Sequence, residues 1–261
     1  MRHLFSCLAM FLMFKLFKSF PGLIQEIRLL FGIRPLEKED VAVLERFFPY
    51  FQNLNAKHKD EFKDRLAYFI ASKKFIPRGE LREISREMKL LVGATAVMVT
   101  FGFRNLKLKN FSKILLYPDN YYSTINKTYH QGEVNPRLGI IVISWKSFVE
   151  GFLVPNNGIN LGIHEMAHAL KLENQIQNEE SNFFNSGAWQ QYEKLAKNEI
   201  LKIKRNEDSI FRPSASKNIH EFFAVSLESF FEIPQQFKAY HPELYKSLVY
   251  LLQQDPLVLA K

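Results

Sequence analysis

The stretch LGIHEMAHAL, residues 161–170, determines the fold and the chemistry that we expect of this chain. It contains no proline, and apolar residues surround a pair of histidines, so we predict a largely buried α-helix here. On a helix, residues four positions apart lie one above the other on the same face. His164 and His168 can therefore direct one ring nitrogen each at a single metal ion, with Glu165 set to the side.

The spacing of these three residues is the H-E-x-x-H arrangement, in which a glutamate acts as general base on a water molecule that zinc activates. The alternative is a buried helix whose histidines hydrogen-bond to the backbone or to water. We favour the metal, because burying two imidazoles and a carboxylate is costly unless each has a partner. The sequence therefore predicts a zinc site that contains His164 and His168, with Glu165 as the base.

A catalytic zinc ion takes three protein ligands and keeps one position open. The best third candidate is Glu221, in a second apolar helical segment over residues 218–232. Glu228 follows seven residues later and shares the same helix face. We consider two roles for Glu228: a hydrogen-bond acceptor that orients a ligand histidine, or an ion pair with a buried lysine or arginine.

Two of these motifs resemble one known family. GIHEMAHAL (162–170) and NIHEFFAVSLESFFE (218–232) resemble the Mlc titration factor A family of zinc-dependent peptidases and, more distantly, the catalytic domain of anthrax lethal factor. The resemblance covers about residues 40–250. Supporting segments in the same order are FIASKKFIP (69–77), ILLYPDNY (114–121), IIVISWKSF (140–148) and PNNGINLGIHE (155–165).

The resemblance implies a zincin-like α+β metallopeptidase that is mostly helical. It implies a small mixed sheet beside the H-E-x-x-H helix and an amino-terminal helical subdomain. It also implies that Zn²⁺ is bound by His164, His168 and Glu221, with Glu165 as the catalytic base. The divisions that we expect are an apolar segment at 1–20, the helical subdomain at 21–110 and the catalytic domain at 111–261.

The chain departs from the family at one position. Members usually have a tyrosine seven residues before the ligand glutamate, where its hydroxyl can stabilise the oxyanion, and here that position is Ser214. A serine is too short to replace the phenol in place. Arg212 or His220 is an alternative donor, or zinc alone polarises the carbonyl. Loss of one oxyanion donor typically costs about a hundred- to a thousandfold in rate.

Two functions follow from these residues. The first is a zinc-dependent peptidase, either an endopeptidase or an aminopeptidase, that acts on a peptide or protein substrate. The second is a zinc-containing binding or regulatory protein that sequesters a transcriptional repressor or another protein partner with little or no hydrolysis. The substitution at Ser214 favours the second more than it would in a typical family member.

Composition limits the other classes of function. The 261 residues are 47% hydrophobic, enough for one sizeable core. The single cysteine, Cys7, excludes a disulfide within the chain and suits a reducing, cytoplasmic location. The net charge is +8, but basic residues are interspersed with acidic ones, so we expect no nucleic-acid partner.

The apolar run 4–14 is too short to span a bilayer. It is either an interfacial helix, which gives residues 1–20 weak membrane contact, or a helix packed on the domain.

The remaining pattern predicts the secondary structure around the site. Short β-branched runs predict strands at 114–117 and 139–145, and residues 150–160 predict a loop before the metal helix. By analogy with other zinc peptidases, 140–145 is either the exposed edge that binds an extended peptide or a plain core strand. Periodic apolar residues predict helices over 37–54, 57–74, from Ser85 to about 99, 185–206, 219–232 and 241–253.

Overall fold

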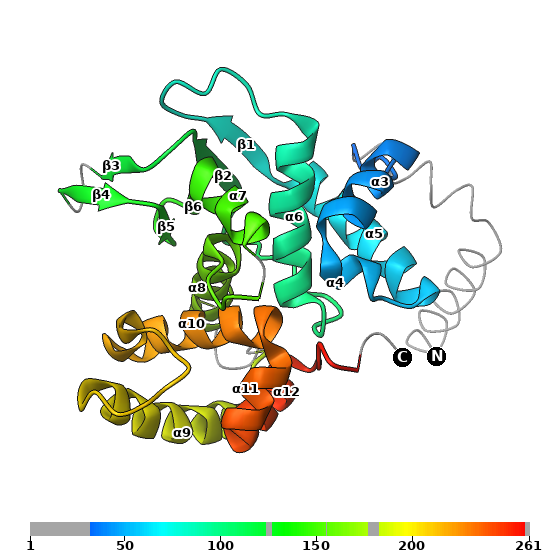
Figure 1. Ribbon diagram of the computed structural model, residues 1–261. Helices are drawn as coiled ribbons and strands as arrows, with labels where there is room; N and C mark the ends of the chain where they lie inside the picture. The colour runs from blue at the N-terminus through cyan, green and yellow to red at the C-terminus, as the bar shows by residue number, and fades with distance from the viewer. Residues whose placement is uncertain (1–31, 124–126, 155, 177–182, 259–261) are drawn as a thin grey trace, which may run out of the picture.

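The structure is a computed structural model that describes residues 32–123, 127–154, 156–176 and 183–258 (Figure 1). Its described part is a mostly helical α+β fold with one small mixed sheet, which confirms the fold class at that level. The predicted apolar segment 1–20, with Cys7, lies outside the described residues. None of the helices in the described ranges combines the length and the apolar character needed to cross a membrane.

The first four helices of the described part contribute many of the residues of the hydrophobic core. The segment predicted as one helix over 37–54 is split at Phe48, because Pro49 has no N–H with which to continue the helix. The last of the four starts after Ser85, whose hydroxyl accepts the N–H of Met88, as its sequence predicts. The helices are α3 (Lys38–Phe47), α4 (Pro49–Gln52), α5 (Ala56–Ser72) and α6 (Arg86–Thr100).

A small sheet follows, in the strand order β1-β2-β6-β5. The first three strands are parallel, and β5 runs antiparallel to β6. A separate two-stranded hairpin, β3–β4, extends beside it (Figure 1). The bounds are β1 (Lys74–Pro77), β2 (Lys113–Tyr117), β3 (Tyr121–Ser123), β4 (Thr128–His130), β5 (Gly132–Asn135) and β6 (Ile140–Ser144).

The position of β6 decides between the two roles that the sequence left open for residues 140–145. β6 pairs with β2 on one side and with β5 on the other, so residues 140–145 are not the edge of the sheet. The alternative, a core strand, is the arrangement found. Among the described strands, β5 forms this side of the sheet. Its four residues, Gly-Glu-Val-Asn, lack the apolar alternation that predicts a strand. They form a strand because they pair with β6.

The carboxyl-terminal half is helical. The predicted loop 150–160 is too long, because α7 continues to Leu153 from a cap in which Ser144 accepts the N–H of Ser147. The predictions for α8, α9, α10 and α12 are confirmed within a few residues, whereas α11 was not predicted. The elements are α7 (Trp145–Leu153), α8 (Leu161–Ile176), α9 (Ser186–Lys204), the 3₁₀ turn η2 (Pro213–Ser216), α10 (Ile219–Glu232), α11 (Pro234–Tyr240) and α12 (Pro242–Leu252).

Helix α8 contacts α6, α10 and the strands β5 and β6, so it is surrounded by elements from both halves of the chain (Figure 1). Near its end, the buried carboxylate of Glu173 accepts the backbone N–H groups of Lys109 and Asn110. β1, which lies before residue 110, pairs with β2, which lies after it, so the sheet contains residues from both sides of the domain boundary expected at 110. The division into a helical subdomain and a catalytic domain at that residue stays a prediction.

Candidate metal centre

Asn160 fixes the start of the helix that carries the two histidines. Its side-chain oxygen accepts the N–H of Ile163 at 3.1 Å, and its carbonyl accepts the N–H of His164 at 2.9 Å. These bonds satisfy N–H groups that a helix start leaves without partners. The asparagine, 2% exposed, also donates its own N–H to Glu228 of α10 at 2.7 Å. The start of α8 is thereby joined to the helix that carries Glu221.

Glu221 lies in the first turn of α10. The Asn218 side chain caps that helix by accepting the N–H groups of His220 at 2.9 Å and Glu221 at 3.0 Å. The cap fixes the backbone from which the Glu221 carboxylate reaches α8. The helix α10 begins and ends where the sequence predicts, and its next two turns are buried.

The structure brings His164, His168 and Glu221 together. The two Nε2 atoms lie 3.2 Å apart, His164 Nε2 lies 3.7 Å from Glu221 Oε2, and His168 Nε2 lies 3.3 Å from Glu221 Oε1. Four ligands at zinc bond lengths around a tetrahedral centre lie roughly 3.3–3.6 Å from one another. The three side chains therefore form a candidate metal site whose spacing suits tetrahedral zinc.

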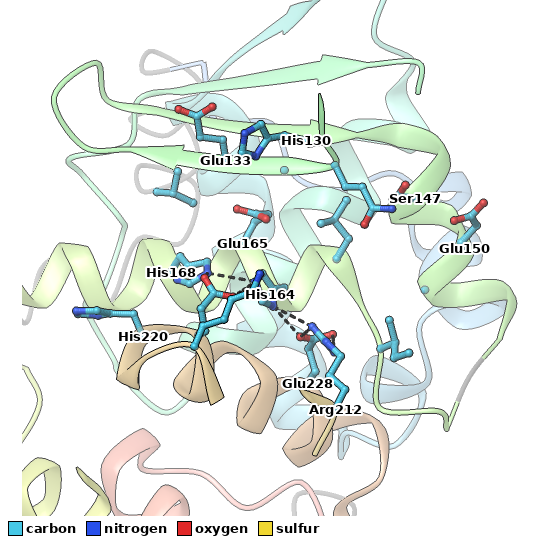
Figure 2. Close-up of a pocket in the computed structure, with 18 of the residues that line it drawn as sticks. His130, Glu133, Ser147, Glu150, His164, Glu165, His168, Arg212, His220 and Glu228 are labelled. Carbon is cyan, nitrogen blue, oxygen red and sulfur yellow. Dashed lines mark hydrogen bonds and ion pairs between the residues drawn. The ribbon is translucent and has the colours of Figure 1, made fainter. Parts of the chain in front are cut away.

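The second nitrogen of His164 supports this interpretation. Nδ1 lies 2.7 Å from Glu228 Oε1, so the carboxylate accepts a proton held on Nδ1 and leaves the Nε2 lone pair directed at the cluster (Figure 2). Burial opposes protonation of His164, but the hydrogen bond and charge of Glu228 outweigh it and raise the pKa of the ring. The hydrogen bond with His168 lowers the pKa of Glu221 to about 2, so this carboxylate is ionised at neutral pH.

Glu228 fulfils both roles that the sequence left open. It is 1% exposed, and besides His164 and Asn160 it accepts two hydrogen bonds from Arg212, at 2.9 and 2.6 Å. It is thus both the acceptor for a candidate ligand histidine and half of an ion pair with an arginine. Because all four donors converge on one carboxylate, the orientation of His164 depends on Glu228.

Arg212 and Ser214 occupy the side of His164 opposite the candidate metal position. Arg212 Nε donates to Ser214 Oγ at 3.0 Å, so the serine that stands at the family's tyrosine position helps to hold the arginine. Figure 2 shows Arg212 beside Glu228, on the far side of His164 from Glu165, and His220 beyond His168. The two terminal nitrogens of Arg212 donate to Glu228, and one of them also lies 3.3 Å from His164 Nδ1, on the side of the ring away from Glu221.

Glu165 points from α8 toward β5, away from Glu228 (Figure 2). Burial is the main cause that raises its pKa, to about 7, and the two histidines oppose the rise. Gly132, the first residue of β5, lies directly against this carboxylate, and a Cβ atom at position 132 would overlap it. Sequence reasoning missed Gly132, because no local signal places a short polar strand above the helix.

A cavity of 1140 Å³ surrounds the cluster. One face of α8 lines it, from Leu161 through the histidines to Gln175. The hairpin residue His130 and strand β5 line it from the other side, together with residues at the ends of α7 and α10. The candidate metal site is thus accessible from a cavity large enough for several residues of an extended peptide.

Comparison with known proteins finds one matching family model and several relatives. The family model described as glucose-regulated metallo-peptidase M90 matches residues 26–253. An uncharacterized protein of Synechocystis sp. is 23% identical over 240 residues, which cover 86% of this chain and 87% of that protein. Mlc titration factor A of Escherichia coli is 31% identical over 167 residues, 58% of this chain and 62% of that protein. Mlc titration factor A of Shigella flexneri is 30% identical over the same length.

Proposed function

Because this chain belongs to the glucose-regulated metallopeptidase family M90, we propose that it is a zinc-dependent peptidase with a zincin-like site. The observation that carries the proposal is the convergence of His164, His168 and Glu221 at separations that suit tetrahedral zinc. Two imidazoles and one carboxylate are also the donor set of several catalytic zinc sites, and they leave a fourth position open. These three residues are the proposed ligands.

Zinc at this site would polarise a scissile carbonyl and lower the pKa of a water molecule to about 7. Glu165 takes the proton of the attacking water and passes it to the leaving amine. Burial raises its pKa to about 7, which suits a group that both accepts and returns a proton near neutral pH. A divalent cation beside it would favour the carboxylate, the form that the base needs first.

The sheet supplies a means of aligning the substrate. Among the described strands, β5 is paired on one side only, so its other side offers backbone groups to an extended peptide. Because Gly132 lies against Glu165, a peptide paired along β5 would bring one of its carbonyls near the base. We therefore assign substrate alignment to β5.

The test is Glu165→Gln, which retains the size of the side chain and removes the base. We expect the variant to bind one zinc per chain and to lose hydrolysis by about a hundred- to ten-thousandfold. Glu207→Gln, at an exposed position after α9, is the matched control and should behave like the parent. Elemental analysis and cleavage of a quenched peptide library measure the two properties. If Glu165→Gln hydrolysed peptides as fast as the parent, the proposed mechanism would be wrong.

One observation favours a second function. Ser214 cannot supply the phenol that stabilises the oxyanion in typical members, and its hydroxyl accepts a hydrogen bond from Arg212 instead. The relatives from Escherichia coli and Shigella flexneri carry the name Mlc titration factor A, which says of them that they titrate Mlc. A chain with one bound zinc and no turnover of any peptide in the library would support a partner-binding role here.

A further inference from the structure

The metal-facing side of α8 continues beyond the candidate ligands. Lys171 lies three residues after His168 and, like it, lines the catalytic cavity. Only 7% of this lysine is exposed. Within the described ranges, no hydrogen bond or ion pair joins its ammonium group to another residue. Most of the side chain is buried, but the ammonium group stays accessible, so a cation without an ion-pair partner lies at the wall of the cavity.

Trp189 of α9 holds the lysine in place. Lys171 Nζ lies 3.3 Å from the centroid of the indole ring, within the range of a cation–π contact. The indole is fixed in turn by Phe184, which stacks on it, and by the edge of Phe223. Burial lowers the pKa of Lys171 to about 8, so most molecules still carry the positive charge at neutral pH. The contact therefore holds a cation in a fixed position at the wall of the cavity.

A second cation and a hydrogen-bond donor lie at this end of the cavity. Lys217 and His220, both exposed, line the same cavity. Partial burial and the nearby Lys171 lower the pKa of His220, so at neutral pH it is mostly uncharged and offers an N–H donor. The charge of Glu193, on α9, favours the protonated form of Lys171, but the ion pair of this glutamate, at 3.0 Å, is with Lys197. Figure 2 shows His220 and Glu150 on opposite sides of the cluster formed by His164 and Glu165. The cavity is thus basic at one end and has a carboxylate at the other.

We propose that Lys171, with Lys217 and His220 beside it, forms a subsite that binds a carboxylate of the peptide substrate. That carboxylate is either an acidic side chain or the carboxyl terminus of the peptide. This inference rests on the proposed peptidase function and specifies its substrates. A carboxylate in this subsite gives the lysine the ion pair that it lacks within the described chain, and it displaces little protein structure because the ammonium is already fixed by Trp189.

The test measures binding separately from hydrolysis. The zinc-loaded Glu165→Gln protein is titrated calorimetrically with alanine octapeptides that carry one Glu or one Gln at each position in turn, with a free or an amidated carboxyl terminus. We expect about tenfold tighter binding when Glu replaces Gln at one position, or when the terminus is free rather than amidated. Either change should also alter the fluorescence of Trp189, recorded in a Trp145→Phe background, because its ring contacts Lys171.

Variants of Lys171 identify the group that binds. Lys171→Met retains an apolar stem over Trp189 and should abolish the tenfold preference without weakening binding of the Gln or amidated peptide. Lys171→Arg should restore the preference. Lys194→Met, an equal loss of charge at an exposed position of α9, is the control and should retain the preference. A preference below twofold in the Glu165→Gln protein, or one that survives in Lys171→Met, overturns the subsite.

The same peptides separate this proposal from the proposed function. If the parent protein hydrolyses the peptides equally well whatever their charge, the peptidase function stands and the subsite is wrong. If the carboxylate preference depends on Lys171 but the parent hydrolyses no peptide, the subsite stands as a binding site and the peptidase function is wrong.

Discussion

Glu228→Gln tests how strongly the candidate metal site depends on a residue that does not bind the metal. The carboxylate accepts hydrogen bonds from Asn160, from His164 and twice from Arg212. Glutamine has nearly the same shape, but it replaces one acceptor oxygen with an NH₂ group. At least one of the present donors would then face another donor, and Arg212 would lose its counter-charge.

The magnitude follows from what the carboxylate does for His164. A partner of this kind orients the ring and makes its free nitrogen more basic, and its removal typically costs 10- to 100-fold in metal affinity. We therefore expect Kd for zinc to rise about 10- to 100-fold in Glu228→Gln, which corresponds to roughly 1.4–2.8 kcal/mol. Arg212 is 29% exposed, so water offsets part of the loss of its ion pair.

Competition with a chromophoric zinc chelator at constant pH measures this affinity. Glu232→Gln is the matched control, because this glutamate lies one turn further along α10 and accepts hydrogen bonds from Asn156 and Asn160 but has none with His164. We expect the control to bind zinc like the parent. If Glu228→Gln also bound zinc within twofold of the parent while remaining folded, the argument that Glu228 positions His164 would fail.

Three further predictions follow. Gly132→Ala should displace the Glu165 carboxylate and lower kcat about a hundredfold with zinc content unchanged, and steady-state rates with elemental analysis check this. Because the pKa of His164 is raised above its ordinary value of 6.5, protons already compete with zinc for the ring above pH 6.5. Apparent zinc affinity should therefore decline as pH falls toward and through 6.5, and a flat titration would contradict this. The Arg86 hydrogen bonds lower the pKa of Asp40 despite its burial, so this carboxylate stabilises the fold above its unfolded pKa and loses that contribution as pH falls through the folded value. Asp40→Asn should therefore reduce the stability of the metal-free protein by about 2 kcal/mol at pH 7, and the difference in Tm should shrink below about pH 4.

The helices that could be predicted are those with local signals. Ser85 caps α6, and Asn218 precedes α10 as its cap, so both helices begin where the sequence indicates. The strands β1 and β5 could not be predicted in this way. Each is four residues long. β1 is ordered by pairing with β2, which is distant in the sequence, and β5 pairs with the neighbouring β6 although its own residues are mostly polar. That is why the sequence left residues 140–145 open as either the exposed edge or a core strand and did not indicate β5.

In the candidate site, too, local sequence predicts some residues, whereas other roles depend on residues distant in the sequence. The spacing of His164 and His168 on one helix is a local property, and the family resemblance implied the third ligand, Glu221. The role of Glu228 depends on Arg212, sixteen positions earlier, and on Asn160 in the segment before α8, so two roles that the sequence presented as alternatives occur together. Asn160 itself could have been identified as a cap, because it directly precedes the first residue of α8.

The most direct test of the account is a crystal structure of the zinc-loaded chain with anomalous data collected on both sides of the zinc absorption edge. The account predicts one zinc peak, about 2.0–2.2 Å from the Nε2 atoms of His164 and His168 and from a carboxylate oxygen of Glu221. A zinc peak bound by other residues, or no peak between these three side chains at saturating zinc, would contradict it.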